Sequence, residues 1–165
     1  MAEFKIIDPP GHFCGKMIRI LRSEHKDVLD RFGLNAHREL KSMFDSSAFR
    51  RAWVIDGELA ALGGVSGSPL ETASYVWVAF SQLARKYPVQ LIKEARKQLR
   101  IVMATRKELV TTVLPEDEAA MRLAVFMGFH CAHTGRGQPA LSKFSRRDLV
   151  SFIKENILAG RIFVI

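Results

Sequence analysis

The chain has 165 residues, a length that suits one domain with a buried core. Apolar residues make up 48% and charged residues 25%, so the composition is globular and excludes wholesale disorder. No apolar run approaches the roughly 20 residues that span a bilayer, and the amino terminus lacks the pattern of a signal peptide. We therefore expect no membrane association and a cytoplasmic location.

The charge balance is strongly positive. Lys and Arg number 25 against 17 Asp and Glu, which gives a formal net charge of +8. Such a field attracts phosphate groups, whether on a nucleotide cofactor or on a nucleic acid. The alternative is a cationic surface that only keeps the protein in solution.

The amino-terminal part predicts an edge segment followed by a strand and helices. Proline and glycine punctuate residues 1–16, which is typical of an arm or edge segment. Residues 17–21 alternate apolar and basic side chains and predict a short strand. Between residues 23 and 44 apolar side chains recur at helical spacing and Gly33 interrupts them, so this stretch predicts two helices or one bent helix.

Asp56-Gly57 is the strongest turn signal in the chain. It lies between the apolar runs 52–55 and 59–62, and Asp and Gly tolerate the positive φ of a type I′ hairpin turn. Residues 63–69, rich in Gly, Ser and Pro, predict a loop after this hairpin.

The following part predicts alternating strands and helices. The almost wholly apolar run 75–80 predicts a central strand that is covered on both faces. Pro88 suits the first position of a helix, because its missing N–H loses no bond there. The apolar stripe of this helix consists of Ile92, Ala95, Leu99, Val102 and Met103. Residues 109–114 predict the next strand, and a helix that opens within 115–118 ends at Gly128.

The carboxyl-terminal part predicts further short elements. Short strands are expected at 131–134 and 140–144, followed by an amphipathic helix from Ser145 that stops before Gly160. Residues 161–165 predict an added strand or a docking tail. Together the elements predict a mixed sheet with helices on both sides.

Residues 110–130 resemble the Gcn5-related N-acetyltransferase (GNAT) superfamily. There, a strand is followed by a helix that carries Asn, an Ala three residues later, an aromatic residue and a final Gly-Phe pair. The segment here reads VTTVLPEDEAAMRLAVFMGFH, in which Ala120 and the pair at 128–129 match. Asp117 stands where Asn is usual, and Ala124 stands where the enzymes carry a general-acid Tyr.

The resemblance covers about residues 17–144 and implies an architecture. It implies an α+β fold with a mixed, mostly antiparallel central sheet flanked by helices, here with an extra carboxyl-terminal helix. We therefore expect an arm at 1–16, a GNAT-like domain at 17–144, and a helix and tail at 145–165 packed on the same domain.

Residues 75–99, YVWVAFSQLARKYPVQLIKEARKQL, are similar to a narrower GNAT-like family among tailed-phage proteins. Some of these are internal virion proteins. They share Tyr-Val-Trp, a Ser or Thr, a basic pair before a proline, and a long basic helix. This similarity implies a phage structural protein or a host protein as a partner, and the virion as an alternative location.

The GNAT resemblance implies acetyl-CoA as a cofactor. In the enzymes a splayed strand offers backbone groups to the pantetheine arm, a role that falls here to Val78, Ala79 and Phe80. The resemblance also assigns Asp117 and Ala120 to the cofactor site. The enzymes use a Tyr to protonate the departing thiolate, and this residue is absent here, so no catalytic residue is assigned.

The phosphate loop of the enzymes is altered in this chain. When Gln82 is aligned with its first position, Arg85 and Tyr87 occupy the two small-residue positions, and neither lets the backbone approach a phosphate as glycine does. The side chains of Arg85 and Lys86 could hold phosphate through charge-assisted contacts instead. The alternative interpretation is that Arg85 and Lys86 only form a solvated turn.

Other candidates are weaker. Acidic side chains nearest the expected cleft could act as a base for an amine, although the helix dipole explains most of them: Glu71, Glu116, Asp117 and Glu118. The histidines and cysteines show no metal-ligand spacing. Between residues 85 and 107 there are eight basic residues and one acid, which is consistent with weak, non-specific nucleic-acid binding.

Three functions follow from these observations. The first is an acyl-CoA-dependent N-acyltransferase, or a degenerate relative that still binds CoA. The second is a non-enzymatic phage virion or host-interaction protein that uses the GNAT fold, which the missing Tyr and glycines favour. The third is a basic accessory protein that binds nucleic acid.

Overall fold

The computed structural model describes most of the chain as two compact units. The described residues are 2–31, 33–71, 73–113, 118–131 and 161–164. Unit 1 comprises Met1–Gly67 and Val76–Gln98, and unit 2 comprises Ser68–Tyr75 and Leu99–Ile165.

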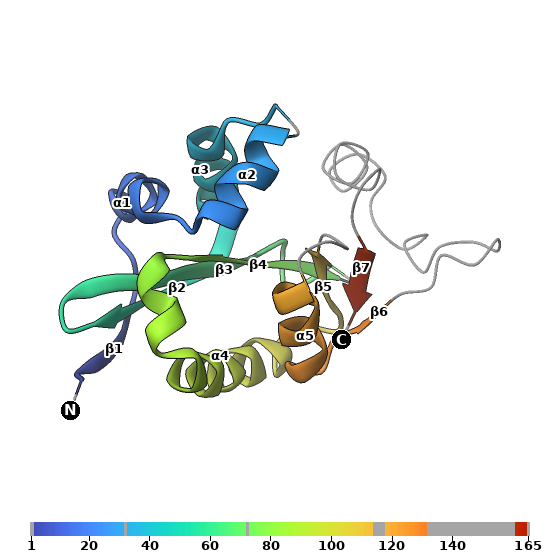
Figure 1. Cartoon of the computed structure of the whole chain (residues 1–165). Helices are drawn as coiled ribbons and strands as arrows, with labels where there is room; N and C mark the ends of the chain where they lie inside the picture. Colours follow the sequence, from blue (N-terminus) through green and yellow to red (C-terminus); the bar gives the residue numbers. More distant parts are fainter. Residues whose placement is uncertain (1, 32, 72, 114–117, 132–160, 165) are drawn as a thin grey trace. The chain divides into compact units, whose positions relative to one another are not determined.

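Unit 1 is a sheet with helices on both faces (Figure 1). Its elements are β1 (Phe4–Ile7), α1 (Phe13–Ile20), α2 (Ser23–Arg31), α3 (Ala36–Ser46), β2 (Ser47–Ile55), β3 (Glu58–Ser66), most of β4 (Ser74–Phe80), the 3₁₀ helix η1 (Gln82–Lys86) and the first part of α4 (Pro88–Met103). β1 pairs antiparallel with β2, and β2 pairs antiparallel with β3. Helices α1, α2 and α3 lie on one face of this sheet and α4 lies on the other.

β4 is the next strand beyond β3 and runs antiparallel to it. The Ser81 N–H donates to the Ala60 carbonyl at 2.9 Å, whereas the Trp77 carbonyl lies beside Gly63. Residue numbers therefore rise along β4 as they fall along β3, which is the antiparallel arrangement. The predicted strand at 75–80 is confirmed.

The hairpin between β2 and β3 is confirmed at its turn. Asp56 has φ 48° and Gly57 has φ 80°, as the two central residues of a type I′ turn require. The β1 strand pairs with β2 from Phe4 opposite Ile55 to Ile7 opposite Ala52, so residues 4–7 form an edge strand, as expected. The predicted arm at 1–16 extends too far, because residues 13–16 belong to helix α1.

The predicted loop at 63–69 begins too early. Gly63 and Gly64 belong to β3, and both are buried. A Cβ atom at Gly64 would lie 2.9 Å from the Phe49 carbonyl oxygen and from Ser47 Oγ, and 3.0 Å from the Trp77 ring. These glycines are therefore present because neighbouring atoms occupy the space of a side chain, and not because the chain turns.

The strand predicted at 17–21 is wrong. Residues 17–20 form the end of helix α1, and Leu21 is the residue that caps it. The buried side chains of this stretch are Cys14, Met17 and Leu21, which are three and four residues apart and share one helical face. Alternation over five residues was too short a pattern to separate a strand from a helix.

Two helices end with the same glycine arrangement. Gly33 follows α2 with φ 64°, and the next amide donates to the Leu29 carbonyl at 2.8 Å. Gly128 follows α5 (Glu118–Phe126) with φ 99°, and the next amide donates to the Ala124 carbonyl at 3.0 Å. Both are Schellman-type ends, in which glycine supplies the left-handed residue. They confirm that 23–44 forms two helices, α2 and α3, and that Gly128 closes α5.

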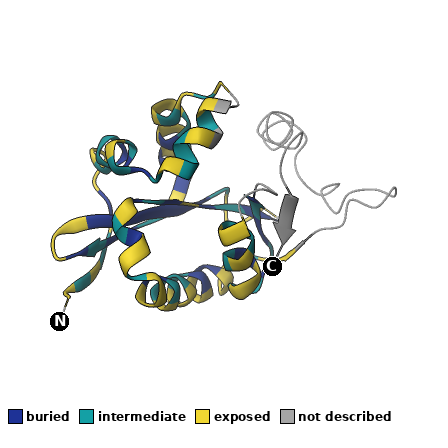
Figure 2. Ribbon diagram, in the orientation of Figure 1, coloured by how far each residue is buried: buried dark blue, intermediate teal, exposed yellow. Residues whose placement is uncertain are grey.

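The core of unit 1 lies mainly in β2, β3 and β4, which Figure 2 shows as largely buried. Trp53, Ile55 and Ala61 cluster with Ala84 of η1 and Leu91 of α4. The predicted stripe of α4 was partly wrong: Leu91 is buried, whereas Met103 is 43% exposed. The predicted start of this helix at Pro88 is confirmed.

Unit 2 contains the beginning of β4, the end of α4, and the elements that follow. These are β5 (Leu109–Val113), α5, β6 (His130–Cys131) and β7 (Arg161–Val164), and the strand order in this unit is β4-β5-β7-β6. β7 runs antiparallel to both of its neighbours, so residues 161–164 form the added strand that was expected.

Several predictions lie outside the described residues. These are most of the strand at 131–134, the strand at 140–144, the helix from Ser145, and its packing on the domain. Across the part of the chain that is described, no helix is long and apolar enough to cross a membrane.

Candidate functional site

The outward edge of β4 is the first part of the candidate site. The Ser81 N–H donates toward β3, whereas the Phe80 carbonyl accepts from the Arg22 N–H at 3.0 Å on the opposite side. Because successive residues of a strand direct their backbone groups to opposite edges, Val78 shares the outward edge with Phe80, and Ala79 faces β3. Of the residues predicted to hold the pantetheine arm, Val78 and Phe80 therefore lie on the outward edge, where the Phe80 carbonyl is already bonded to Arg22.

The side chains of these residues lie in different surroundings. Val78 is 40% exposed, so the expectation that β4 is covered on both faces is wrong at this position. Ala79 is buried, and Phe80 is half-buried against the cluster around Trp53. Val78 thus combines an exposed apolar side chain with backbone groups on the outward edge of β4.

The residues after β4 form η1 in place of a glycine-rich loop. The Ala84 N–H donates to the Ser81 carbonyl and the Tyr87 N–H donates to the Ala84 carbonyl, both at 3.2 Å. These amides are therefore used inside the turn, and binding of an anion here would depend mainly on side chains. Gln82 is exposed on this turn.

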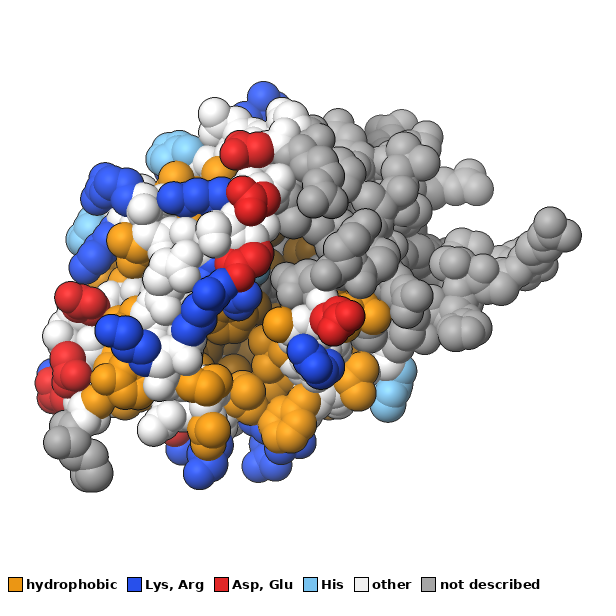
Figure 3. Space-filling view, viewed as in Figure 1, with side chains coloured by type: hydrophobic (Ala, Val, Ile, Leu, Met, Phe, Trp, Pro, Cys, Tyr) orange, Lys and Arg blue, Asp and Glu red, His pale blue; other side chains and the backbone are white. Residues whose placement is uncertain are grey.

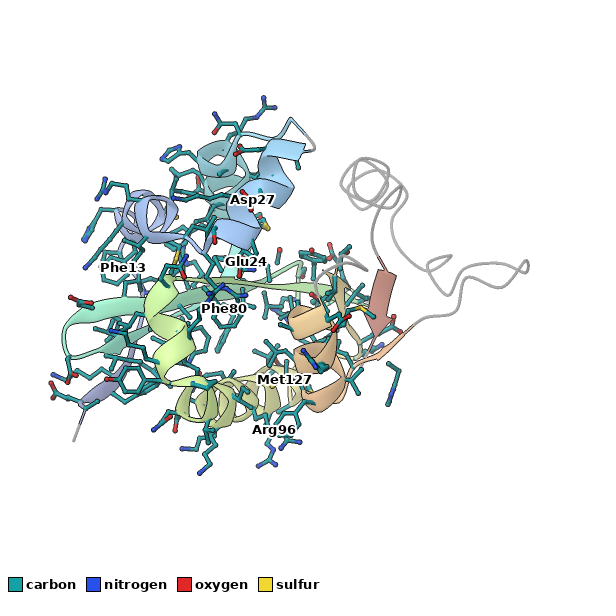
Figure 4. The ribbon with its side chains drawn as sticks, in the orientation of Figure 1. Phe13, Glu24, Asp27, Phe80, Arg96 and Met127 are labelled. Atoms are coloured by element: carbon teal, nitrogen blue, oxygen red, sulfur yellow. The ribbon has the colours of Figure 1, made fainter. Side chains whose placement is uncertain are left out.

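Two arginines and a glutamate meet at the end of β4, and we call this cluster the arginine corner (Arg22, Glu24 and Arg85). Arg85 Nη2 donates to Glu24 Oε1, and Arg22 Nε lies 3.6 Å from Glu24 Oε2. The Arg85 and Glu24 side chains are 52% and 44% exposed. Figure 4 shows Glu24 at the start of α2 near Phe80 at the end of β4. Lys86, the other predicted phosphate-binding side chain, is exposed.

Arg22 and Glu24 were not predicted from the sequence. The acids considered as candidates lie between residues 71 and 118, whereas Glu24 is 61 residues away from its partner Arg85. A local sequence pattern cannot predict an ion pair between residues so far apart. Glu24 and Arg85 come together because the Arg22 N–H is bonded to the end of β4.

Unit 2 carries the remaining predicted residues. Ala120 is half-buried on α5, and Ala124, at the position of the general-acid Tyr, is only 6% exposed. Asp117 lies outside the described residues. Ala124 is therefore a packing residue on α5, and its methyl group has no proton to give.

The parallel ladder of unit 2 is short. It pairs residues 74–75 of β4 with residues 109–110 of β5, and β4 continues beyond it to Phe80. Burial raises the pKa of the Tyr75 phenol above its usual value, and hydrogen bonds from Thr112 partly oppose that rise. The phenol therefore keeps its proton at neutral pH.

The described residues give no support for metal binding. The described residues contain no group of three or more His, Cys, Asp or Glu side chains that could hold a metal ion. Cys14 is buried, and its burial raises the pKa of the thiol.

Comparisons with known proteins identify the fold. No protein-family sequence model and no curated protein sequence matches the chain. A GNAT-family acetyltransferase from Streptococcus pneumoniae is 12% identical, covers 99% of this chain and 98% of its own, and has a TM-score of 0.57. Diaminobutyrate acetyltransferase EctA from Paenibacillus lautus, in complex with L-2,4-diaminobutyric acid and coenzyme A, is 17% identical with 100% and 95% covered and a TM-score of 0.59. The PaiA N-acetyltransferase from Thermoplasma acidophilum, in complex with coenzyme A, is 10% identical with 98% of each chain covered and a TM-score of 0.59.

These likenesses establish the architecture. The chain has the mixed, mostly antiparallel sheet flanked by helices that GNAT-type acetyltransferases have, and the predicted fold class is confirmed. At such low identities the fold alone is shared, and function has to be argued from the residues of the site.

Proposed function

We propose that the chain binds CoA or acetyl-CoA along β4 and η1, as an acyl-CoA-dependent N-acyltransferase or as a degenerate relative of one. The observation that carries this proposal is the outward edge of β4 at Val78, where backbone groups face away from β3 and the side chain is 40% exposed. Two solved structures of the same fold hold coenzyme A, which supports the choice of ligand.

Different residues would bind different parts of the ligand. The Val78 N–H and carbonyl suit the amide groups of a pantetheine arm, as in the addition of an extended strand. Arg85 and Lys86 follow on η1, and their charges suit the phosphates, with Gln82 beside them. Asp117 and Ala120 belong to unit 2, and the assignment of both to the cofactor rests on the resemblance of their segment to the GNAT helix.

Acyl transfer at such a site needs little from the protein. An amine nitrogen attacks the thioester carbonyl carbon, the C–N bond forms, the C–S bond breaks, and the nitrogen loses a proton to the solvent. The departing thiolate takes a proton from water, since Ala124 has none to donate. General-acid catalysis contributes about 10²- to 10⁴-fold in enzymes that possess it. We therefore expect transfer to be slow, and binding to be the better-preserved property.

A thermal-shift titration with CoA and acetyl-CoA tests the proposal. We expect a saturable rise in melting temperature that the double substitution Arg85→Ala with Lys86→Ala reduces. Lys93→Ala with Arg100→Ala removes the same charge from exposed positions of α4 and serves as the control. Absence of a shift at millimolar ligand, or an equal loss in both double variants, contradicts the proposal.

A non-enzymatic role in a phage virion or in contact with a host protein is the second candidate. The burial of Ala124 favours it, because the position used for proton donation in the enzymes serves packing here. An assay of CoA release from acetyl-CoA with a panel of primary amines separates the two. Binding of acetyl-CoA without release of CoA supports a non-enzymatic protein. Release of CoA faster than in the absence of the protein supports an enzyme.

Nucleic-acid binding is the third candidate. Lys93, Arg96, Lys97 and Arg100 are exposed on α4. Figure 3 shows basic side chains along the outer side of this helix, and Arg96 points away from the sheet in Figure 4. Binding through phosphates alone predicts a salt-sensitive mobility shift with random DNA, which Lys93→Ala with Arg100→Ala would weaken.

A further inference from the structure

The arginine corner holds one carboxylate between two guanidinium groups. Glu24 Oε1 accepts from Arg85 Nη2, and Glu24 Oε2 lies 3.6 Å from Arg22 Nε and accepts from Ser23 Oγ at 3.2 Å. The cluster carries one net positive charge, because two cations surround a single anion. Carboxylates and phosphates occupy the same fork of donors on a guanidinium. Glu24 therefore sits where the oxygen atoms of an external anion would sit.

The corner is attached to the end of β4. The Arg22 N–H donates to the Phe80 carbonyl at 3.0 Å, and Leu21 forms an isolated bridge with Ser81. This backbone contact holds Arg22 next to η1, although about sixty residues separate the two along the chain. A cation from the junction of α1 and α2 thus lies beside the turn where the phosphate loop of the GNAT enzymes would be.

Hydrogen bonding at the corner is incomplete. Arg22 Nε and Ser81 Oγ are both buried, and neither has a hydrogen-bond partner among the described residues. Buried polar atoms of this kind are uncommon, and each is costly unless a water molecule or a ligand satisfies it. The unpartnered Arg22 Nε indicates that the corner has a donor to spare for an additional group.

We propose that Arg22 and Arg85 form an anion-binding pair and that Glu24 is its internal occupant, which a phosphate group displaces when it binds. The class of ligand, a phosphate ester of the CoA type, rests on the proposed function. The inference adds a second cation, Arg22, and a residue that opposes binding. Glu24 then sets how tightly phosphate is held, since its carboxylate competes for Arg85 in the unliganded protein.

The proposal predicts opposite effects for neighbouring substitutions. Glu24→Gln removes the competing charge and should tighten anion binding about two- to fivefold, the size of one half-exposed ion pair. Arg85→Gln should weaken binding about tenfold, because a charge-assisted hydrogen bond is lost. Arg22→Gln should act in the same direction, and the more exposed Arg85 provides the test if the Arg22 variant fails to fold.

Isothermal titration with inorganic pyrophosphate, and separately with CoA, at constant ionic strength measures these effects. Asp45→Asn is the matched control, because Asp45 pairs with Lys41 on α3 at similar side-chain exposure (55% and 50%) and its loss changes the net charge equally. Tighter binding of pyrophosphate in Glu24→Gln but not in Asp45→Asn supports the proposal. An unchanged Glu24→Gln variant, or an equal gain in both variants, overturns it.

The two ligands separate this inference from the proposed function. If the natural chain binds CoA and Glu24→Gln leaves both affinities unchanged, the inference fails and CoA binding stands. If pyrophosphate binds more tightly to Glu24→Gln while CoA binds to neither protein, the anion site stands and the CoA assignment falls. If pyrophosphate binds to neither protein at millimolar concentration, the anion site is absent.

Discussion

Two regions of unit 1 are held together in opposite ways. Around Gly64, the Trp77 indole N–H donates to Ser47 Oγ at 2.8 Å, and both residues are 5% exposed. In the arginine corner, the ion pair between Glu24 and Arg85 is about half-exposed. Steric fit and a buried hydrogen bond define the first region, whereas mutual attraction of hydrated charges defines the second. The comparison indicates that substitutions at the corner should cost less stability than substitutions at the buried contact.

The strongest test of the buried contact is Gly64→Ala. The added Cβ would lie 2.9 Å from the Phe49 carbonyl oxygen, which belongs to the backbone and cannot rotate away. We expect the free energy of unfolding to fall by about 2–3 kcal/mol, at the upper end of the usual range for overpacking. Urea denaturation with a fixed m-value measures this change.

The matched control for this test is Gly15→Ala. Gly15 lies within α1, and a Cβ atom there would meet nothing within 4 Å. Alanine in a helix should raise the free energy of unfolding by about 0.5–1 kcal/mol. Should Gly64→Ala be as stable as the natural protein, the close approach around Trp77 is not what requires glycine in β3.

Ser47→Ala tests the polar part of the same contact. The substitution leaves the buried Trp77 indole N–H without its acceptor and also removes the hydrogen bond from Ser47 Oγ to the Met43 carbonyl. We expect a loss of about 1–2 kcal/mol in the free energy of unfolding. A smaller loss when the same substitution is made in a Trp77→Phe background would assign the effect to this bond, and equal losses in both backgrounds would contradict it.

The two regions also differ in how far the sequence predicts them. The hairpin follows from Asp56-Gly57 and the start of α4 follows from Pro88, because each signal acts on its own backbone. The role of Gly64 depends on an indole ring thirteen residues further along the chain, so its local composition predicted a loop instead.

In the candidate site, too, local features could be predicted and contacts between distant residues could not. The strand with Val78 and the turn with Arg85 were predicted from local pattern and from resemblance, and their assignment to a cofactor stays a prediction. Glu24 could not be predicted, because its partner is 61 residues away. Charged side chains of this kind carry no periodicity that a sequence pattern can register.

The smallest expected effect concerns the corner itself. A double-mutant cycle of Glu24→Gln and Arg85→Gln, followed by urea denaturation, measures the coupling between the two side chains. We expect it to stay below about 1 kcal/mol, since exposed ion pairs are weakened by water and by side-chain entropy. The cycle also cancels the separate contribution of Glu24 in the first turn of α2, which interacts with the helix dipole. A coupling of 2 kcal/mol or more would make the corner a structural element like the contact around Gly64, and its charges would then be too strongly engaged with each other to yield to a phosphate.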